Sequence, residues 1–349
     1  MVFEPSISGH RLYYVRLIVD EILARGQKAI IGTSVGAAET DEWKLHLGKL
    51  SSDVQVLESL HRSPEGIADL AASAGIDHVV VPSGDEVAVH LGFRRKWRSR
   101  ATMTLLIMRE RAQPSGVRGI AWLKGWSKMA LLRAADGLGG VRVCLLKSSL
   151  WSGRSGLSVA KDPVTLAGDI ASLKELGLSW GLDPERYWFA IVGSVSERKN
   201  LPLVVAALAG LGRGKIGLVV GGQMTQNVRN RLPELEQQLT ESGIALVVHD
   251  RLLNDLELDS LVCAVDCVVL AHSNEGSSGV MGKAAAVGTR IAAAGAQSLK
   301  VDCRAAPQIA AWSSLKGPDL HRLLADSSSL ESPTPSISSS ARDFASALL

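Results

Sequence analysis

The stretch that decides the fold of this 349-residue chain reads Ala271-His-Ser-Asn-Glu-Gly-Ser-Ser-Gly-Val-Met-Gly-Lys-Ala-Ala-Ala-Val-Gly288. Its first residues predict the end of a buried strand, and its alanine-rich end predicts a helix. Small residues fill the turn between them, namely Gly276, Ser277, Ser278 and Gly279. Glycines let backbone amides approach a ligand closely, and the helix points its positive dipole end at the same place. The turn over Gly276–Gly279, which we call the anion turn, therefore favours an anion. Glu275 beside it can accept hydrogen bonds from sugar hydroxyls, and this combination suggests a nucleotide-sugar site.

A second segment has the same design and reads Phe189-Ala-Ile-Val-Gly-Ser-Val-Ser-Glu-Arg-Lys-Asn200. A strand again ends in a loop of small residues, and the loop carries two cations, Arg198 and Lys199. Two cations at the carboxyl end of a strand can face a diphosphate. Gly-Ser turns that bind nothing are common in α/β proteins, so the first turn alone leaves a plain connection open. The second segment favours a ligand site.

Together the two segments resemble the donor-binding half of retaining GT-B glycosyltransferases, specifically glycosyltransferase family four (group 1). Gly193 followed by Arg198-Lys-Asn200 is similar to the family's Gly…Arg/Lys-Lys-Asn/Gly element. Glu275-Gly-Ser-Ser-Gly-Val280, with the alanines after it, is similar to its Glu-x7-Glu element. At the front, Ser8–Gly26 is similar to the glycine-containing first loop and helix of the acceptor domain. The matches lie at both ends and in the middle of the chain.

The resemblance implies an α/β protein with the GT-B fold, in which two doubly wound Rossmann-like domains face a cleft. The activity it implies is transfer of a sugar from a nucleotide-sugar donor to a glycan or lipid-linked acceptor, with retention of configuration and without a metal or other cofactor. The catalytic residues would be Arg198, Lys199 and Glu275. Donor binding would use Gly9, Gly193, Ser277, Ser278, Gly279, Val280 and Lys283. His10 would contact the acceptor, although a histidine in an N-terminal loop is more often merely exposed.

One position departs from the family pattern, because Lys283 stands where the second glutamate is expected. That carboxylate would accept two hydrogen bonds from the ribose of the donor, whereas an ammonium can only donate. Lys283 can instead donate to ribose or phosphate oxygens, or donor binding has been lost. Two alternative functions therefore stay open: a non-catalytic GT-B protein that binds a glycan or partner, and a nucleotide-sugar epimerase.

Alternating strands and helices are expected through both halves of the chain. In the first half the expected strands are Val2-Phe3, Lys28–Gly32, Val54–Leu57, His78–Pro82, Thr102–Met108 and Val141–Leu146. In the second half they are Trp188–Val192, Ile216–Gly221, Ala245–His249, Cys267–Ala271 and Arg290–Ala294. The length also exceeds what one core supports, so we expect two doubly wound domains. The expected bounds are 1–162 and 163–325, followed by a serine- and proline-rich tail with a terminal helix over 326–349. The resemblance implies that the first domain binds the acceptor and the second binds the nucleotide sugar.

Composition agrees with this architecture. Hydrophobic residues make up 46% and aromatic residues 4% of the chain, which suits parallel strands buried on both faces. The cysteines lie in apolar segments without a histidine that would complete a metal-ligand pattern, so we expect buried free thiols in a reducing cytosol. No segment has the length and hydrophobicity of a membrane span or a signal peptide. We therefore expect a cytoplasmic protein.

Positive charge is concentrated between Leu91 and Ala135, which we call the basic segment. It holds eleven Lys and Arg against one acid, Glu110, whereas the whole chain has a formal net charge of +3. Three tryptophans lie among these cations, namely Trp97, Trp122 and Trp126. Two interpretations stay open: an ordinary solvated face, and a surface that lies on the anionic inner face of the cell membrane. No nucleic-acid-binding module is visible, so we expect no nucleic-acid partner.

Two further motifs are weaker. Asp255-Leu-Glu-Leu-Asp259 follows Asn254, which is a good helix cap, and we expect its acids to lie in a solvated first helical turn. Gly32-Thr-Ser-Val-Gly36 follows a strand but lacks the Gly-x-Gly-x-x-Gly spacing of dinucleotide-binding proteins. An oxidoreductase is therefore the less favoured reading.

Overall fold

The chain forms two compact units. The structure is a computed structural model that describes residues 1–6, 11–50, 54–59, 62–108, 118–212, 215–276, 278–336 and 339–349, with 118–125 described by their backbone alone. Unit 1 consists of Met1–Lys147, Gly153–Asp162 and Ser340–Leu349, and unit 2 consists of Ser148–Ser152 and Pro163–Ser339. Each unit is described separately below.

Unit 1 is built on one parallel sheet whose described strands follow the order β3-β2-β1-β4-β5-β6-β7. The strands are β1 Val2–Glu4, β2 Ile30–Thr33, β3 Gln55–Glu58, β4 His78–Val81, β5 Thr102–Ile107, β6 Val141–Lys147 and β7 Ser158–Lys161. The helices are α1 Arg11–Ala24, α2 Asp41–Leu47, α3 Pro64–Ser73, α4 Asp85–Arg94, α5 Arg118–Asp136 and α13 Ala341–Ser346. The strand order reverses between β1 and β4.

Unit 2 repeats this plan with the order β10-β9-β8-β11-β12-β13, all parallel. The strands are β8 Tyr187–Val192, β9 Ile216–Gly221, β10 Ala245–His249, β11 Cys267–His272, β12 Arg290–Gly295 and β13 Ala310–Ser313. The helices are α6 Ile170–Gly177, α7 Leu201–Ala209, α8 Gln226–Glu241, α9 Asp255–Ala264, α10 Gly279–Val287, α11 Gln297–Ala305 and α12 Gly317–Ser328. Its strand order reverses between β8 and β11.

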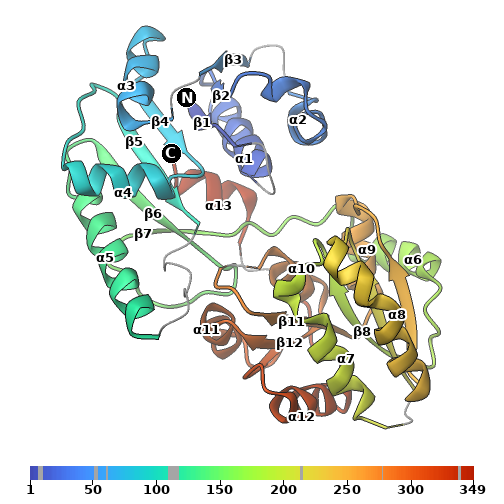
Figure 1. Cartoon of the computed structure of the whole chain (residues 1–349). Helices are drawn as coiled ribbons and strands as arrows, with labels where there is room; N and C mark the ends of the chain where they lie inside the picture. Colours follow the sequence, from blue (N-terminus) through green and yellow to red (C-terminus); the bar gives the residue numbers. More distant parts are fainter. Residues whose placement is uncertain are drawn as a thin grey trace. The chain divides into compact units, whose positions relative to one another are not determined.

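Each sheet is covered by helices on both faces (Figure 1). In unit 2 one hydrophobic cluster joins the sheet to α6, α9, α10 and α11, and a second joins it to α7, α8 and α12. In unit 1 the corresponding clusters contain α1, α2 and α13 on one side and α3, α4 and α5 on the other. Apolar runs in the central strands explain this, because a strand buried on both faces has no polar side. The predicted doubly wound architecture is confirmed.

The structure adds two edge strands to those expected from sequence, β7 and β13. Each has four residues and is only partly buried, so its own side chains carry little hydrophobic signal. Pairing with β6 and β12 defines them. The expected tail is also divided: α12 runs through Ser328, and the terminal helix α13 packs on α1, with the rings of Phe344 and Tyr14 5.0 Å apart.

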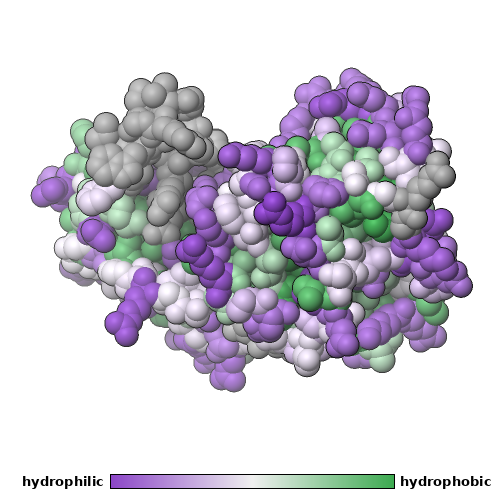
Figure 2. Space-filling model, turned by 90° about the horizontal axis from the view of Figure 1, so that it is seen from below, coloured by the Kyte–Doolittle hydropathy of each residue, from purple (hydrophilic) through white to green (hydrophobic). Residues whose placement is uncertain are grey.

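Among the described residues, no helix is long and apolar enough to cross a bilayer. Figure 2 shows hydrophilic residues spread over the visible face, with hydrophobic ones in small groups between them. The four cysteines are free thiols, as expected; Cys144, Cys267 and Cys303 are buried and Cys263 is partly buried.

Candidate functional site

The two sequence motifs meet at the carboxyl ends of β8 and β11. Asn200 donates from its side-chain amide to the carbonyl of Ala271 at 2.8 Å, and the amide of Ser273 donates to the carbonyl of Arg198 at 2.9 Å. The loops are therefore joined although about 70 residues separate them. Because the strand order reverses here, this is the position at which open α/β sheets bind ligands.

Two glycines allow the conformation of the loop after β8 and the close approach of the segment after β9 to it. Gly193 has a φ of +84°, which disfavours other residues, and a Cβ there would lie 3.5 Å from the Nζ of Lys199. Gly222 has a φ of +133°, and its Cβ would lie 2.1 Å from the carbonyl oxygen of Gly193. A side chain at Gly222 would therefore displace the loop that follows β8.

Lys199 is a buried cation in the short 3-10 helix Glu197–Lys199. Its side chain is 5% exposed and its ammonium donates to the carbonyl of Val192. Burial is the main cause that lowers the Lys199 pKa to about 7, and the charge of Arg198 acts in the same direction. Among the described residues no carboxylate forms an ion pair with Lys199. A bound anion would supply the missing negative charge.

His272 ends β11 beside these cations. Its Nε2 is buried and has no hydrogen-bond partner among the described residues. Burial, followed by the charges of Lys199 and Arg198, lowers the pKa of His272 to about 3. The imidazole is therefore neutral near pH 7, and its Nε2 is a buried polar atom without a hydrogen-bond partner among the described residues, in the part of unit 2 that also holds Lys199.

Glu275 has a role that sequence reasoning missed. Its two carboxylate oxygens accept hydrogen bonds from the backbone amides of Gln297 and Ser298, each at 2.8 Å. The Ser298 hydroxyl also donates to the carbonyl of Gly276 at 3.0 Å. Glu275 therefore fixes the anion turn to the start of α11, where a negative charge is favourable. Each oxygen keeps a second lone pair, so contact with sugar hydroxyls stays a prediction.

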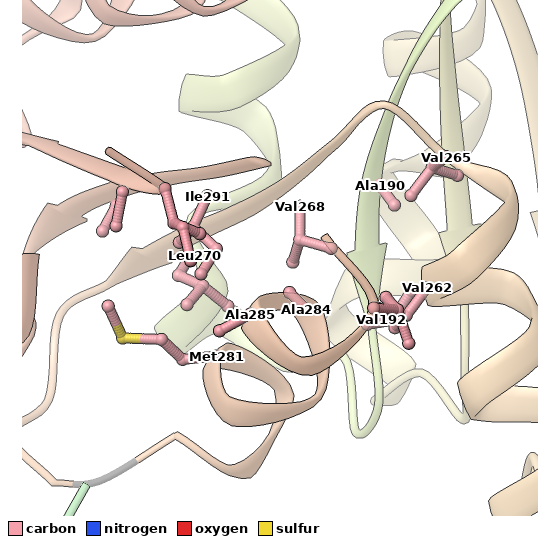
Figure 3. Packing of buried hydrophobic residues seen from close by; sticks show 14 of the residues in the cluster. Ala190, Val192, Val262, Val265, Val268, Leu270, Met281, Ala284, Ala285 and Ile291 are labelled. Atoms are coloured by element: carbon pink, nitrogen blue, oxygen red, sulfur yellow. The ribbon is translucent and has the colours of Figure 1, made fainter. Parts of the chain in front are cut away.

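Helix α10 follows the anion turn and is held rigidly on the sheet. Figure 3 shows Ala284 and Ala285 of α10 packed beside Val268 and Leu270 of β11. Ser278 precedes the helix, and Gly279 and Val280 begin it, so their N–H groups belong to the first turn that lacks intrahelical acceptors. Ser277 lies outside the described residues.

Lys283 points into the protein rather than outward from α10. Its ammonium pairs with the carboxylate of Asp259 and donates to the carbonyl of Thr165 at 3.0 Å. Asp259 is fully buried and also accepts from the amide of Ala167 at 2.7 Å, so the expectation that it is solvated was wrong. The helix cap was correct, since Asn254 caps α9. The local sequence could not show this burial, because α9 and α10 pack together only in the tertiary structure. There the ammonium of Lys283 neutralises the carboxylate of Asp259. Donor binding by Lys283 stays a prediction.

Unit 1 has a pocket of about 940 Å³ at the carboxyl ends of β1, β4 and β5, which we call the unit 1 pocket. Its polar lining includes Glu4, Ser83, Asp85, Arg11, Arg62, Arg94 and Lys128. Lys128 and Asp85 form an ion pair at 2.7 Å. None of these side chains was assigned to a ligand pocket from sequence, although a glutamate directly after the strand Val2-Phe3 was a usable signal. The expected site residues Gly9 and His10 lie outside the described residues.

The described residues hold no group of three or more His, Cys, Asp or Glu that could bind a metal ion. The expectation of metal-free chemistry stays a prediction.

Comparison with known proteins identifies the fold. No protein family model and no curated protein matches the sequence. A glycosyltransferase from Rickettsia africae ESF-5 is similar in structure, with a TM-score of 0.65, 12% identity and coverage of 99% of this chain and 91% of that one. HepE from Anabaena, solved in complex with UDP, has a TM-score of 0.62, 15% identity and coverage of 99% and 94%. Sucrose-phosphate synthase from Thermosynechococcus elongatus has a TM-score of 0.58 at the same identity and coverage. The chain has the GT-B fold of these glycosyltransferases, as predicted.

Proposed function

We propose that this chain is a glycosyltransferase that takes its sugar from a nucleotide-sugar donor, whose diphosphate binds at the carboxyl ends of β8 and β11. The observation that carries the proposal is Lys199, a buried ammonium that has no carboxylate partner among the described residues. Arg198 and the first turn of α10 add positive charge to the same part of unit 2. The negative charge of a diphosphate would neutralise these cations. UDP in the HepE complex shows that one protein of this fold binds such a group.

The chemical requirement is to stabilise the diphosphate as it leaves the sugar. The glycosidic bond to phosphate breaks and its electrons go to the leaving oxygen. The oxygen of an acceptor hydroxyl forms the new bond, and the proton of that hydroxyl passes to the departing diphosphate. Lys199, Arg198 and the amides of Gly279 and Val280 would meet the developing charge without a metal ion. One preorganised donor of this kind contributes about 3–4 kcal/mol to transition-state binding. Glu275 would orient the sugar through its remaining lone pairs.

Titration calorimetry tests donor binding directly. We expect one nucleotide sugar from a panel of UDP-, GDP- and dTDP-sugars to bind with a Kd at least tenfold below the others, and EDTA to leave binding unchanged. Failure of every nucleotide and nucleotide sugar to bind would contradict the proposal. Transfer to a glycan or lipid-linked acceptor is then followed with the donor that binds.

Retention of configuration and membership in glycosyltransferase family four are the finer parts of the proposal, and they rest on the motif resemblance. Proton NMR of the product formed from an α-linked donor would give an α-linkage for retention and a β-linkage for inversion. Donor turnover without any acceptor, giving an isomerised sugar nucleotide, would favour an epimerase. Binding without turnover would favour a non-catalytic protein.

We also propose that the basic segment lies on an anionic membrane, which would serve a lipid-linked acceptor. Phe93 at the end of α4 is 80% exposed and Trp126 of α5 is 67% exposed. Arg94, Arg95 and Lys96 are exposed beside Phe93. Exposed aromatic residues among cations suit the headgroup region of a bilayer. Trp97 does not belong to this surface, because it is partly buried and donates to the carbonyl of Ala101. Arg109 and Arg111 lie outside the described residues, as do the side chains of Arg118, Trp122 and Lys124.

Liposome sedimentation tests the membrane proposal. Each surface cation contributes about 1 kcal/mol of attraction to anionic lipid. Binding to phosphatidylglycerol vesicles should fall steeply with salt and be lost when Arg94, Arg95, Lys96 and Arg98 are all changed to glutamine. Equal binding to neutral and anionic vesicles, or binding to neither, would contradict the membrane proposal. The basic segment would then be interpreted as an ordinary solvated face.

A further inference from the structure

His272 is a buried histidine without a complete set of hydrogen bonds. It is the last residue of β11, it is 8% exposed, and its Nε2 has no hydrogen-bond partner among the described residues. A buried polar atom without a partner costs folding free energy, so each one in a native structure calls for a reason such as a bound ligand. The imidazole is therefore a candidate for ligand contact.

The backbone at His272 is held by hydrogen bonds from two neighbouring loops. The amide of Ser273 donates to the carbonyl of Arg198 at 2.9 Å, and the carbonyl of His272 accepts from the amide of Ala296 at 3.0 Å. Gly295 permits the second contact, because a Cβ there would lie 2.4 Å from the carbonyl oxygen of His272. The loops after β8 and β12, the strands on either side of β11, thus fix this end of the strand. A position fixed in this way suits a residue that contacts a ligand.

The charges around His272 select the ligand group. The charged side chains that act on it are those of Lys199 and Arg198, and both are positive. A neutral imidazole carries one proton, on Nδ1 or on Nε2. With the proton on Nε2, the buried atom donates a hydrogen bond, and an anionic oxygen attracted by the two cations can accept it. With the proton on Nδ1, the buried atom only accepts, and it would need a ligand hydrogen that carries partial positive charge, which these cations repel.

A second histidine has the same kind of unpaired nitrogen in a different electrostatic setting. His249 ends β10, and its Nε2 is also buried without a hydrogen-bond partner among the described residues. The charged groups that act on His249 are Arg251 and Glu257, which form an ion pair at 2.8 Å. The positive charge beside His249 is thus balanced by a carboxylate, whereas both charged groups beside His272 are cations. An anion is therefore expected at His272 and not at His249.

We infer that the Nε2–H of His272 donates a hydrogen bond to an anionic phosphate oxygen, and that His272 and Lys199 bind the same phosphate group. That this group belongs to the diphosphate of the donor rests on the proposed function; the binding of a phosphate group does not. In the transfer reaction His272 contacts the leaving group, so it is a further catalytic residue. Because its ring is neutral, its hydrogen bond meets the developing charge without the repulsion that a third cation would bring.

Calorimetry on the full chain with inorganic pyrophosphate tests this contact without presupposing a base or a sugar. We expect pyrophosphate to bind the wild type, and His272→Leu to weaken that binding by roughly tenfold, because a hydrogen bond to a charged group is lost. His272→Gln places an amide N–H near the position of Nε2 and should restore most of the affinity. His249→Leu is the matched control and should leave the Kd unchanged. For transfer, kcat/KM should be lower in His272→Leu than in His272→Gln.

Thermal unfolding without ligand separates a ligand contact from a structural role. His272→Leu replaces an unpaired polar atom with an apolar group, so its Tm should rise by about 2–4 °C. A ring that supports the fold through a hydrogen bond would give the opposite pattern, with a lower Tm in His272→Leu and recovery in His272→Gln. That pattern would overturn the inference.

Two binding results would also overturn it: no pyrophosphate binding to the wild type, or the same Kd for the wild type and His272→Leu. Titration with nucleotide sugars reports on the proposed function separately. A nucleotide sugar that binds the wild type and His272→Leu equally would remove the inference and leave the transferase. Pyrophosphate binding that depends on His272, in a chain that binds no nucleotide sugar, would remove the transferase and leave the phosphate contact.

Discussion

The carboxyl edges of the two sheets have the same topology, but the buried charged groups at these edges have opposite signs. In unit 1 the strand order reverses at β1 and β4, where a buried carboxylate, Glu4, ends the first strand. In unit 2 it reverses at β8 and β11, where a buried ammonium, Lys199, follows the corresponding strand. Burying each of these charged groups costs folding free energy, and neither side chain has an ion-pair partner among the described residues. The shared fold supplies the position, whereas the charge at that position differs between the two units.

The first prediction separates the site of unit 2 from its supporting structure. Lys283→Glu removes the partner of buried Asp259 and places a second carboxylate beside it. We expect a loss of about 3–5 kcal/mol in the free energy of unfolding, measured by urea denaturation, because an unpaired charge is left buried. The double variant Lys283→Met with Asp259→Asn should recover much of it. Wild-type stability with a changed donor Kd would instead place Lys283 in the donor site.

The second prediction removes the buried cation of unit 2. Lys199→Met keeps the volume and discards the charge, so kcat/KM for transfer should fall by about 10²–10³-fold while the fold stays intact. Lys199→Ala should also abolish transfer, and Lys215→Met, at an exposed surface pair, is the control. An unchanged kcat/KM would contradict the assignment of the diphosphate to this edge.

The third prediction concerns the connection between the anion turn and α11. Glu275→Ala leaves the amides of Gln297 and Ser298 without their acceptor. We expect a loss of about 1–2 kcal/mol in unfolding free energy, as for a lost helix cap, together with weaker donor binding. Weaker donor binding with an unchanged free energy of unfolding would show that Glu275 acts on the sugar alone.

The fourth prediction uses pH to test Lys199 in the wild-type protein. Its pKa of about 7 lies below the ordinary value of 10.5, and a bound diphosphate would raise it. Donor affinity should therefore fall by up to about tenfold per pH unit above 7, with proton uptake on binding, measured by calorimetry in two buffers of different ionisation enthalpy. The free protein should become more stable over the same range, because only the unfolded chain keeps the lysine proton. Lys199→Met should remove both trends.

Several parts of this molecule followed from local sequence pattern. Apolar runs predicted most strands, and the loops after β8 and β11 were located by small residues next to cations or a helix. The same pattern could not show that Asp259 is buried, because its partner Lys283 is 24 residues away and lies on another helix. It also could not show that both oxygens of Glu275 are engaged by α11.

The sequence by itself determined the two doubly wound units and the composition of the loops after β8 and β11, since these depend on periodicity and residue type within a few positions. The tertiary structure alone decided the edge strands β7 and β13, the burial of Lys199 and the pairing of Lys283. It also decided that Glu4 and Ser83, separated by almost eighty residues, line one pocket. The physical reason is that parallel strands acquire neighbours through long crossovers, so the environment of a charged side chain is set by segments distant in the chain.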